Sequence, residues 1–166
     1  MAGTLSVQQI QGLASAADPT TVTIPAGHKL IAPGHVVQVV SNFITTDFNT
    51  TSTSFVSTGL SASITPSSTS SKVFVIMSMP SWYIGADNAY ATVFRGSTNI
   101  GNGDYGLMMV YNTAVYAPST TQVMDSPSST SSLTYTVHVR SVGGSTTYAS
   151  YPTYGHHTIT VMEIAQ

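Results

Sequence analysis

Residues that could take part in catalysis are few in this chain and stand far apart along it. The six acidic side chains are Asp18, Asp47, Asp87, Asp104, Asp125 and Glu163. A glycosidase needs two carboxylates that flank the scissile bond, and a serine hydrolase needs an acid and a base placed beside its nucleophile. The G-x-S-x-G motif that carries such a serine is absent. We therefore expect no catalytic residues and a protein that is not an enzyme.

One glycine-rich segment has the spacing of a nucleotide-binding motif. Residues 101–106 are G-N-G-D-Y-G and match G-x-G-x-x-G letter for letter. The motif binds a dinucleotide only where a strand precedes it and a helix follows it. Here the apolar residues 107–111 follow, and they predict a strand. We interpret the segment as a turn and expect no cofactor.

Three histidines raise the question of a metal site. His156 and His157 are adjacent, and His138 precedes them along the chain. Neutral imidazole is a common metal ligand, but adjacent residues on a strand point to opposite faces, so one strand does not aim both rings at one ion. A metal site remains an alternative if a threefold axis brings three copies of one histidine together. We favour hydrogen bonding for these histidines and expect no metal.

The residue types best suited to bind a ligand are aromatic and stand beside short polar loops. The candidates are Trp82, Tyr83, Asp87, Asn88, Tyr148, Tyr151 and Tyr154. Flat rings can stack on sugars while Asp and Asn hold hydroxyl groups, and Trp and Tyr are also common interface anchors. Because binding residues often lie on loops held by a rigid sheet, we expect these residues to be exposed near one end of the domain. The alternative is that they are ordinary core and rim aromatics.

The composition limits the classes of partner. Charged residues make up 6% of the 166 residues, against roughly 25% in an average soluble domain. With four Lys and Arg residues in all, the chain lacks the basic patch that binds phosphate backbones, so we expect no nucleic-acid partner. Apolar runs are all shorter than the ~18 residues of a membrane span, so we expect no membrane insertion. The absence of cysteine excludes disulfides.

The hydrophobic pattern predicts a protein built from strands. The expected strands are residues 35–41, 56–64, 72–79, 89–95, 107–111, 120–124, 133–141 and 157–165. Apolar and polar side chains alternate in 56–64 and 133–141, which is typical of strands buried on one face. Clusters of Gly, Pro, Ser, Asn and Asp fill the gaps as turns. The fold class we expect is all-β: a jelly-roll-like antiparallel β-sandwich of about eight strands with an N-terminal arm.

The first 34 residues differ from the rest and end at the turn formed by Pro33 and Gly34. They are too few to fold alone, and their conformation over residues 5–17, helical or extended, stays open. We expect residues 1–34 to be an attachment arm that docks on a neighbouring molecule. Residues 35–166 would then form the β-sandwich knob domain.

The apolar strands also predict an oligomer. Residues 35–41, 72–79 and 107–111 are almost continuously apolar, which indicates strands covered on both faces. A chain of this length need not supply the second covering layer itself, whereas a cyclic oligomer can. We expect a homotrimer. The methionines of these strands fill either the interface between copies or the core of one copy.

Glu163 is the chain's only glutamate and lies within the last predicted strand. If the alternation from Val161 holds, its carboxylate faces inward. A bulge, or an ion pair with Arg95, Arg140 or Lys72, would then be needed to accommodate the buried charge. We expect its role to be structural.

Four segments, in a fixed order along the chain, carry a resemblance to known proteins. They are residues 58–75 (TGLSASITPSSTSSKVFV), 94–101 (FRGSTNIG), 124–127 with 133–137 (MDSP and LTYTV) and 160–166 (TVMEIAQ). Together they resemble small structural proteins of marine and cyanobacterial phages, known as tail-fibre or virion structural proteins. The opening residues 4–11 and 24–27 resemble the leader of such proteins. The resemblance implies a trimer-forming β knob on a virion, and it supplies no catalytic residues.

Three functional hypotheses follow. The first is a non-enzymatic virion surface protein, the trimeric knob of a tail fibre or appendage used in host attachment, whose arm binds other virion proteins and whose surface binds a host glycan. The second is a capsid decoration (cement) protein that stabilises the head. The third is a glycan depolymerase, which the scattered carboxylates disfavour. The resemblance favours the appendage, and the lack of a long stalk favours decoration. The position on the virion and the receptor stay open.

Overall fold

The computed structural model describes residues 32–85, 87–111, 116–150 and 152–166. The chain divides into two units, Met1–Leu30 and Ile31–Gln166, and the first lies outside the described residues. The expected arm of residues 1–34 therefore falls almost wholly outside them. The described part consists of strands and one short 3-10 helix, η1 (Pro152–Tyr154).

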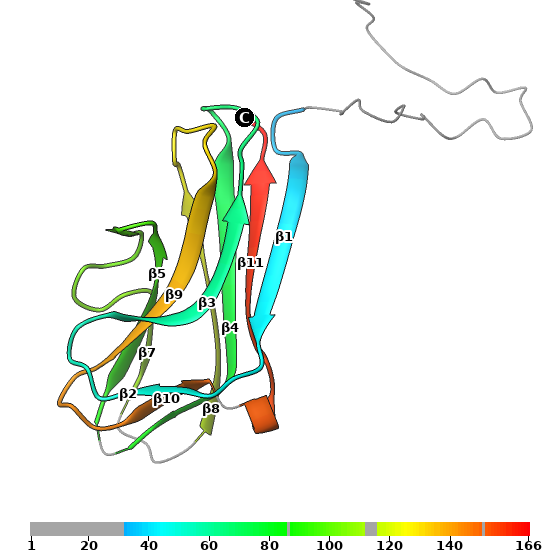
Figure 1. Cartoon of the computed structure of the whole chain (residues 1–166). Helices are drawn as coiled ribbons and strands as arrows, with labels where there is room; N and C mark the ends of the chain where they lie inside the picture. The colour runs from blue at the N-terminus through cyan, green and yellow to red at the C-terminus, as the bar shows by residue number, and fades with distance from the viewer. Residues whose placement is uncertain (1–31, 86, 112–115, 151) are drawn as a thin grey trace, which may run out of the picture. The chain divides into compact units, whose positions relative to one another are not determined.

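The strands form two antiparallel sheets, which lie face to face (Figure 1). Sheet A has the order β1-β11-β4-β8. Strand β10 pairs with the C-terminal end of β4, at Tyr83 and Ile84, and β2 pairs with β10. The strands of sheet A are β1 (Val36–Ile44), β11 (His157–Ile164), β4 (Lys72–Ile84), β8 (Tyr116–Asp125), β10 (Thr147–Ser150) and β2 (Phe48–Thr50). Sheet B has the order β3-β9-β5, and β5 then pairs with both β6 and β7. Its strands are β3 (Val56–Ile64), β9 (Leu133–Ser141), β5 (Ala89–Arg95), β6 (Thr98–Asn99) and β7 (Met108–Val110).

Period-two alternation explains how the sandwich closes. Along β9, Tyr135, Val137 and Val139 are buried while the residues between them stay partly exposed. Strand β3 repeats the pattern and pairs with β9, so that Ala62 lies opposite Tyr135. Apolar faces of this kind gain about 25 cal/mol for each Å² removed from water, and this gain drives the two sheets together.

One core lies between the sheets. It takes side chains from both, and its largest fully buried members are Trp82, Tyr135, Leu60, Ile64, Met77, Met79, Ile159, Val73 and Val75. Two polar side chains of similar size, His157 and Glu163, are also fully buried. The predicted all-β antiparallel sandwich is confirmed. All eight predicted strands are present, and the structure adds the short strands β2, β6 and β10.

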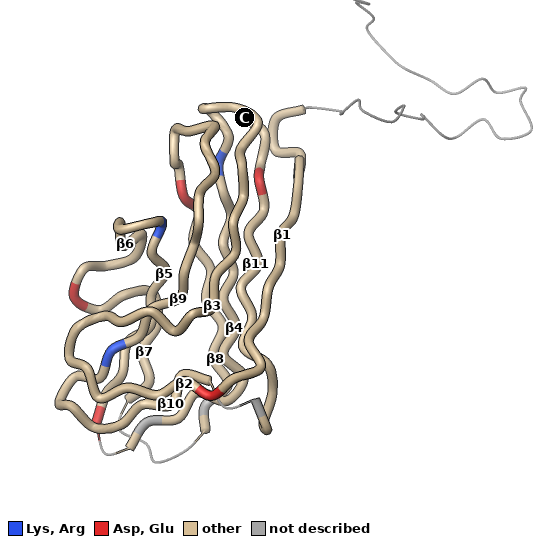
Figure 2. The backbone as a smooth tube through the Cα atoms, in the orientation of Figure 1, with Lys and Arg blue, Asp and Glu red and all other residues tan. Residues whose placement is uncertain are grey.

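The turn predicted at Pro33 and Gly34 is also present, and it joins the start of the domain to its end. Gly34 has a φ of 82°, which favours glycine. Its backbone N–H donates to the carbonyl of Ala165 at 2.8 Å, and the N–H of Ala165 donates to His35 at 2.9 Å. Beyond this turn, charged side chains are sparse and widely spaced along the chain (Figure 2).

Candidate binding surface

Four tyrosines form a continuous cluster on the outer face of sheet A, which we call the tyrosine cluster. Tyr83 of β4 lies opposite Tyr116 of β8 and Tyr148 of β10 in the strand register. Its ring centroid is 5.0 Å from that of Tyr116 and 5.8 Å from that of Tyr148. Tyr154 of η1 extends the cluster, with its ring 4.9 Å from that of Tyr116. Three strands and one helical turn thus bring their rings side by side.

The tyrosine cluster is accessible. Tyr154 and Tyr116 are 59% and 47% exposed, while Tyr83 and Tyr148 are half-buried. Tyrosine combines an apolar ring with a hydroxyl that donates and accepts hydrogen bonds. Neighbouring rings of this kind can pack against the apolar face of a sugar or against a flat protein surface.

The sequence-based candidates divide between the cluster and the core. Tyr83, Tyr148 and Tyr154 come together as described, and Tyr151 lies outside the described residues. Tyr116 is not among the sequence-based candidates, because the weak strand was expected to begin at residue 120, whereas β8 begins at Tyr116. Extending the alternation back from residue 120 could have found it.

Trp82 corrects the expectation that all these aromatics are exposed. Its side chain is 0% exposed, and its ring Nε1 donates to the hydroxyl of Thr147 at 2.9 Å. The register between β4 and β8 shifts between Met79 and Trp82, and Ser81 and Trp82 are both buried. After this irregularity Trp82 faces the core and Tyr83 faces outward. Trp82 is therefore a packing residue and not part of a surface site.

Asp87 and Asn88 hold two loops together. The Asp87 carboxylate accepts hydrogen bonds from the backbone N–H groups of Asn88 and Gly143, and the N–H of Val142 donates to the Asn88 carbonyl. A Cβ at Gly143 would clash with the Asp87 carboxylate unless that side chain shifted, so glycine allows the two loops to approach this closely. Asp87 and Asn88 are half-buried. Their visible role is to join the β4–β5 and β9–β10 loops.

The carboxylate of Glu163 is buried among neutral donors, and of the two alternatives considered, a bulge or an ion pair with Arg95, Arg140 or Lys72, the described residues show no such ion pair. Gln38 Nε2 donates to Glu163 Oε2 at 2.6 Å. The N–H and hydroxyl of Ser67 donate to Oε1 at 2.7 and 2.6 Å, and the Ser71 hydroxyl donates at 2.8 Å.

These hydrogen bonds determine the charge state of Glu163, whose side chain is 0% exposed. Burial works to raise the pKa of Glu163, but the hydrogen bonds from Ser67, Gln38 and Ser71 outweigh it and lower the pKa to about 2. The inward orientation predicted from the alternation is confirmed. A bulge in the β1–β11 pairing lies beside the site, between Val36 and Gln38.

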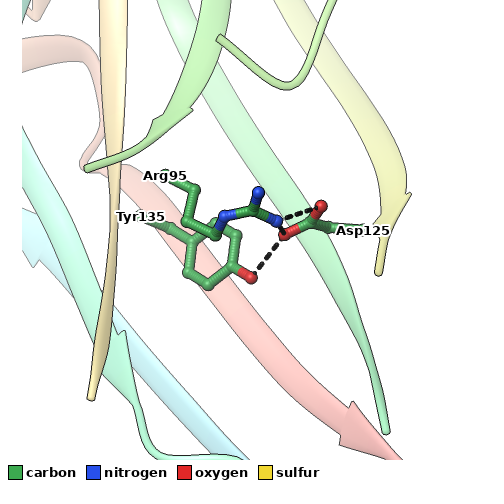
Figure 3. A network of polar contacts seen from close by, with 3 residues as sticks. All are labelled: Arg95, Asp125 and Tyr135. Atoms are coloured by element: carbon green, nitrogen blue, oxygen red, sulfur yellow. Dashed lines mark hydrogen bonds and ion pairs between the residues drawn. The ribbon is translucent and has the colours of Figure 1, made fainter. Parts of the chain in front are cut away.

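A second polar network links the two sheets. Arg95 of β5 forms an ion pair with Asp125 at the end of β8, with Nη1 and Oδ2 2.5 Å apart (Figure 3). The Tyr135 hydroxyl of β9 donates to the same carboxylate at 2.7 Å. The hydrogen bond to Asp125 raises the pKa of Arg95, while burial, with the same carboxylate, raises the pKa of Tyr135. The network is therefore structural.

The outer face of sheet B carries an aromatic cluster around Arg140. The Arg140 guanidinium lies 5.0 Å from the ring centroid of Tyr90 and 5.3 Å from that of Phe55. Tyr105 packs edge-on against Tyr90 at 5.5 Å. Beside them lies a shallow hollow of about 270 Å³ lined by Tyr90, Tyr105, Gly106, Leu107, Met108 and Met109.

The glycine-rich segment that carries Tyr105 is a turn, as predicted. Asn102 and Gly106 pair through two backbone hydrogen bonds of 3.1 and 2.9 Å. Strand β7 follows, so the helix that a dinucleotide site requires is absent from this part of the chain.

The histidines separate as the strand geometry predicts. His157 is buried, with Nε2 3.1 Å from the Ser81 hydroxyl, and burial lowers its pKa to about 4 although the backbone of Ala149 opposes the shift. The exposed ring of His156 stacks on Phe43 with centroids 5.1 Å apart. Within the described ranges, no three His, Cys, Asp or Glu side chains come together in a way that could hold a metal ion.

Comparison with known proteins gives this chain no family assignment: no protein-family model matches it, and no curated protein matches it. In the part of the chain that the structure describes, no helix has the length and apolar character to cross a membrane.

Proposed function

We propose that this chain is a non-enzymatic surface protein of a phage particle, a homotrimer that forms the knob of a tail fibre or appendage in host attachment. The observation that carries the proposal is the tyrosine cluster, an accessible surface of rings held by strands of a rigid sandwich. Such a surface suits the face of a sugar, so a host surface glycan is the ligand class. The chemistry of this contact requires no cofactor, nucleic acid or membrane.

The strand order supports the proposal by analogy of fold. Strands β1-β11-β4-β8 face β3-β9-β5-β7 across the core. Two antiparallel sheets of four such strands are the arrangement of an eight-stranded jelly roll, which occurs in viral capsid and lectin domains. We propose the jelly roll as the finer description of this sandwich.

The segments that resemble phage structural proteins are joined to one another by the two polar networks. Glu163, in residues 160–166, accepts hydrogen bonds from two serines of residues 58–75. Arg95, in residues 94–101, binds Asp125, which follows Met124 in the third segment. The segments that resemble phage structural proteins therefore hold the sandwich together, which supports a shared fold and not a shared catalytic site.

One observation favours capsid decoration as the second candidate. Trp82, the strongest anchor among the sequence-based candidates, is buried and unavailable to a ligand. The tyrosine cluster that remains can contact a capsid neighbour as well as a sugar. A depolymerase has less support, because the carboxylates of Asp125 and Glu163 are both engaged in structural hydrogen bonds.

The deciding experiment measures host attachment by variants of the exposed tyrosines. Tyr116→Ala and Tyr154→Ala should each weaken binding of the purified protein to host cells or their glycans by roughly thirtyfold, about 2 kcal/mol, while the melting temperature barely changes. Tyr105→Ala is the matched control, because Tyr105 is 62% exposed on the other sheet. If particles that carry these variants attach normally but their heads break at a lower temperature than wild-type heads, the capsid decoration hypothesis would replace the appendage hypothesis.

The proposed arm has its own test. A chain that begins at residue 32 keeps Gly34 and His35, whose backbone bonds tie the start of the domain to Ala165. We expect this chain to fold but not to join particles that lack the native protein. Normal incorporation would show that residues 1–31 are not the anchor.

A further inference from the structure

A row of large apolar side chains crosses the outer face of sheet A, away from the tyrosine cluster. Val39 of β1 lies opposite Met162 of β11, Met162 lies opposite Phe74 of β4, and Phe74 lies opposite Met124 of β8. We call these four residues the apolar belt. Val39 and Met124 are 55% and 48% exposed, and the other two are half-buried. The belt runs without interruption from one edge strand to the other.

The face that carries the belt is almost free of charge. Its outward positions beyond the belt include Val36, Ser41, Phe43, Ile76, Ser78, Thr120, Gln122, Thr158, Thr160 and Ile164. Among the described outward positions of these four strands, Lys72 is the one charged side chain, and it lies at the end of β4. A partner can therefore cover this face without removing charged groups from water, which would be costly.

Sheet B shows how the same chain covers an outer face when it does so by itself. Tyr90, Thr92 and Phe94 point outward from β5, yet Tyr90 is 7% exposed and Thr92 is 0% exposed. Phe55, from the β2–β3 loop, packs edge-on against Phe94, and Tyr105 packs against Tyr90. At the two edges of the apolar belt, by contrast, Val39 and Met124 remain 55% and 48% exposed.

The edge of sheet A also lacks the usual protection. Exposed edge strands normally carry charges, prolines or a covering segment, because an open apolar edge promotes association. Strand β1 has the sequence VVQVVSNFI, without charge or proline, and among the described strands it pairs with β11 alone. Val36, Val39 and Phe43 are each more than 40% exposed along it. This edge meets the belt at Val39, which belongs to both.

We infer that the apolar belt is the surface through which copies of this chain meet, around the threefold axis of the proposed trimer. The inference rests on the proposed function and assigns its partner surface. In a cyclic trimer each copy contacts its two neighbours through two different parts of its surface, and the β1–β11 half and the β4–β8 half of this one broad face can serve as those two parts.

The size of the face fits a contact between copies. Four strands at about 4.8 Å spacing and roughly eight residues at about 3.3 Å give a planar area of about 500 Å². Side chains that stand out from the sheet make the accessible area larger. A typical stable interface covers about 800 Å² for each partner.

The experiment compares two exposed methionines on opposite sheets. Met124 of sheet A is 48% exposed and Met109 of sheet B is 52% exposed, so arginine at either position leaves the core intact. The wild-type chain and Met109→Arg should scatter light as a trimer, at three times the 17.4 kDa mass of the chain. Met124→Arg and Val39→Arg, at opposite edges of the belt, should shift to the monomer mass at micromolar concentration. Circular dichroism should show unchanged strand content in all three variants.

Two results would overturn the inference. Folded Met124→Arg and Val39→Arg proteins that keep the trimer mass would show that the copies meet elsewhere. A wild-type protein of monomer mass would show that something other than a second copy, such as residues 1–31 of the same chain, covers the face. Neither result depends on host attachment, so the role of the tyrosine cluster is tested separately.

Discussion

Ser71 and Glu163 are 92 residues apart in the sequence, and the hydroxyl of Ser71 donates to the Glu163 carboxylate at 2.8 Å in the interior of the protein. Ser71 is 3% exposed and Glu163 is 0% exposed. The negative charge is therefore stabilised by hydrogen bonds from neutral groups and not by a cation. Because Ser71 immediately precedes β4 and Glu163 lies in β11, the contact fixes the two central strands of sheet A at one end.

Because the pKa of Glu163 is lowered in the folded protein, we expect the unfolding free energy to decrease in strong acid. That pKa is about 2 in the folded protein against an ordinary value of 4.5, so folding favours the ionised form. The contribution is fully present above pH 4.5 and is lost as the pH falls through 2; the shift corresponds to about 3 kcal/mol of unfolding free energy. Glu163→Gln should destabilise the protein at pH 7 by about 2 kcal/mol. In urea unfolding, this deficit should shrink at pH 3.

The control is Asp47→Asn, which removes an exposed carboxylate from the β1–β2 loop. Its unfolding free energy should follow that of the wild type at both pH values. A Glu163→Gln protein whose deficit is the same at pH 7 and pH 3 would contradict the depressed pKa.

Because the pKa of His157 is also lowered, we expect a second decrease in unfolding free energy, at higher pH than the one due to Glu163. The pKa of His157 is lowered from 6.5 to about 4 by burial, so folding favours the neutral ring. The stability is complete above pH 6.5 and falls by about 3 kcal/mol as the pH drops to 4, because only the unfolded chain takes up the proton. In His157→Gln this slope of unfolding free energy between pH 6.5 and 4 should be smaller by that amount, and the part that remains should include the contribution of His138, whose pKa burial also lowers. The neighbouring exposed residue provides the control, since His156→Gln should keep the slope.

Because the Arg95–Asp125–Tyr135 network joins the two sheets, we expect its side chains to contribute to the unfolding free energy in a coupled way. Asp125→Asn should lower the unfolding free energy by about 2 kcal/mol, because hydrogen bonds to charged groups contribute roughly 1.5–3 kcal/mol each. Since the Arg95 side chain is 24% exposed, the ion pair is partly screened by solvent and contributes less than a fully buried pair. A double-mutant cycle of Asp125→Asn with Tyr135→Phe should give a coupling energy above 0.5 kcal/mol. Strict additivity would show that the two side chains do not act together.

The strands could be predicted from the sequence because their cause is local. The alternation in residues 56–64 and 133–141 coincides with β3 and β9, since a sheet buried on one face requires period two. The orientation of Glu163 follows from the same rule. Its neutral partners do not, because Gln38, Ser67 and Ser71 approach it only through the pairing of distant segments.

The binding surface was predicted only in part, for a similar reason. Trp82 and Tyr83 are adjacent in sequence, and the irregularity in the β4–β8 register decides which of them faces the core. Pro80 lies inside that irregularity and is its sequence signal, because proline within a strand marks an edge or a bulge, but it does not indicate which of the two aromatic residues then faces the core. Tyr116 joins the cluster through its pairing with Tyr83, which depends on strand order and not on sequence distance.

Trp82 is the chain's only tryptophan, so the fluorescence of the protein reports directly on where this side chain lies. A buried indole emits at shorter wavelength than an exposed one and is shielded from soluble quenchers, so the folded protein should show blue-shifted emission that iodide barely quenches. Trp82→Ala should lower the unfolding free energy by about 3–5 kcal/mol, because it leaves a cavity in the core and removes one of the two hydrogen bonds of the Thr147 hydroxyl. Tyr154→Ala, at a 59% exposed position, should change the unfolding free energy by less than about 0.5 kcal/mol. If iodide instead quenched the folded protein as strongly as the unfolded chain, Trp82 would lie on the surface and would return as a ligand-binding residue.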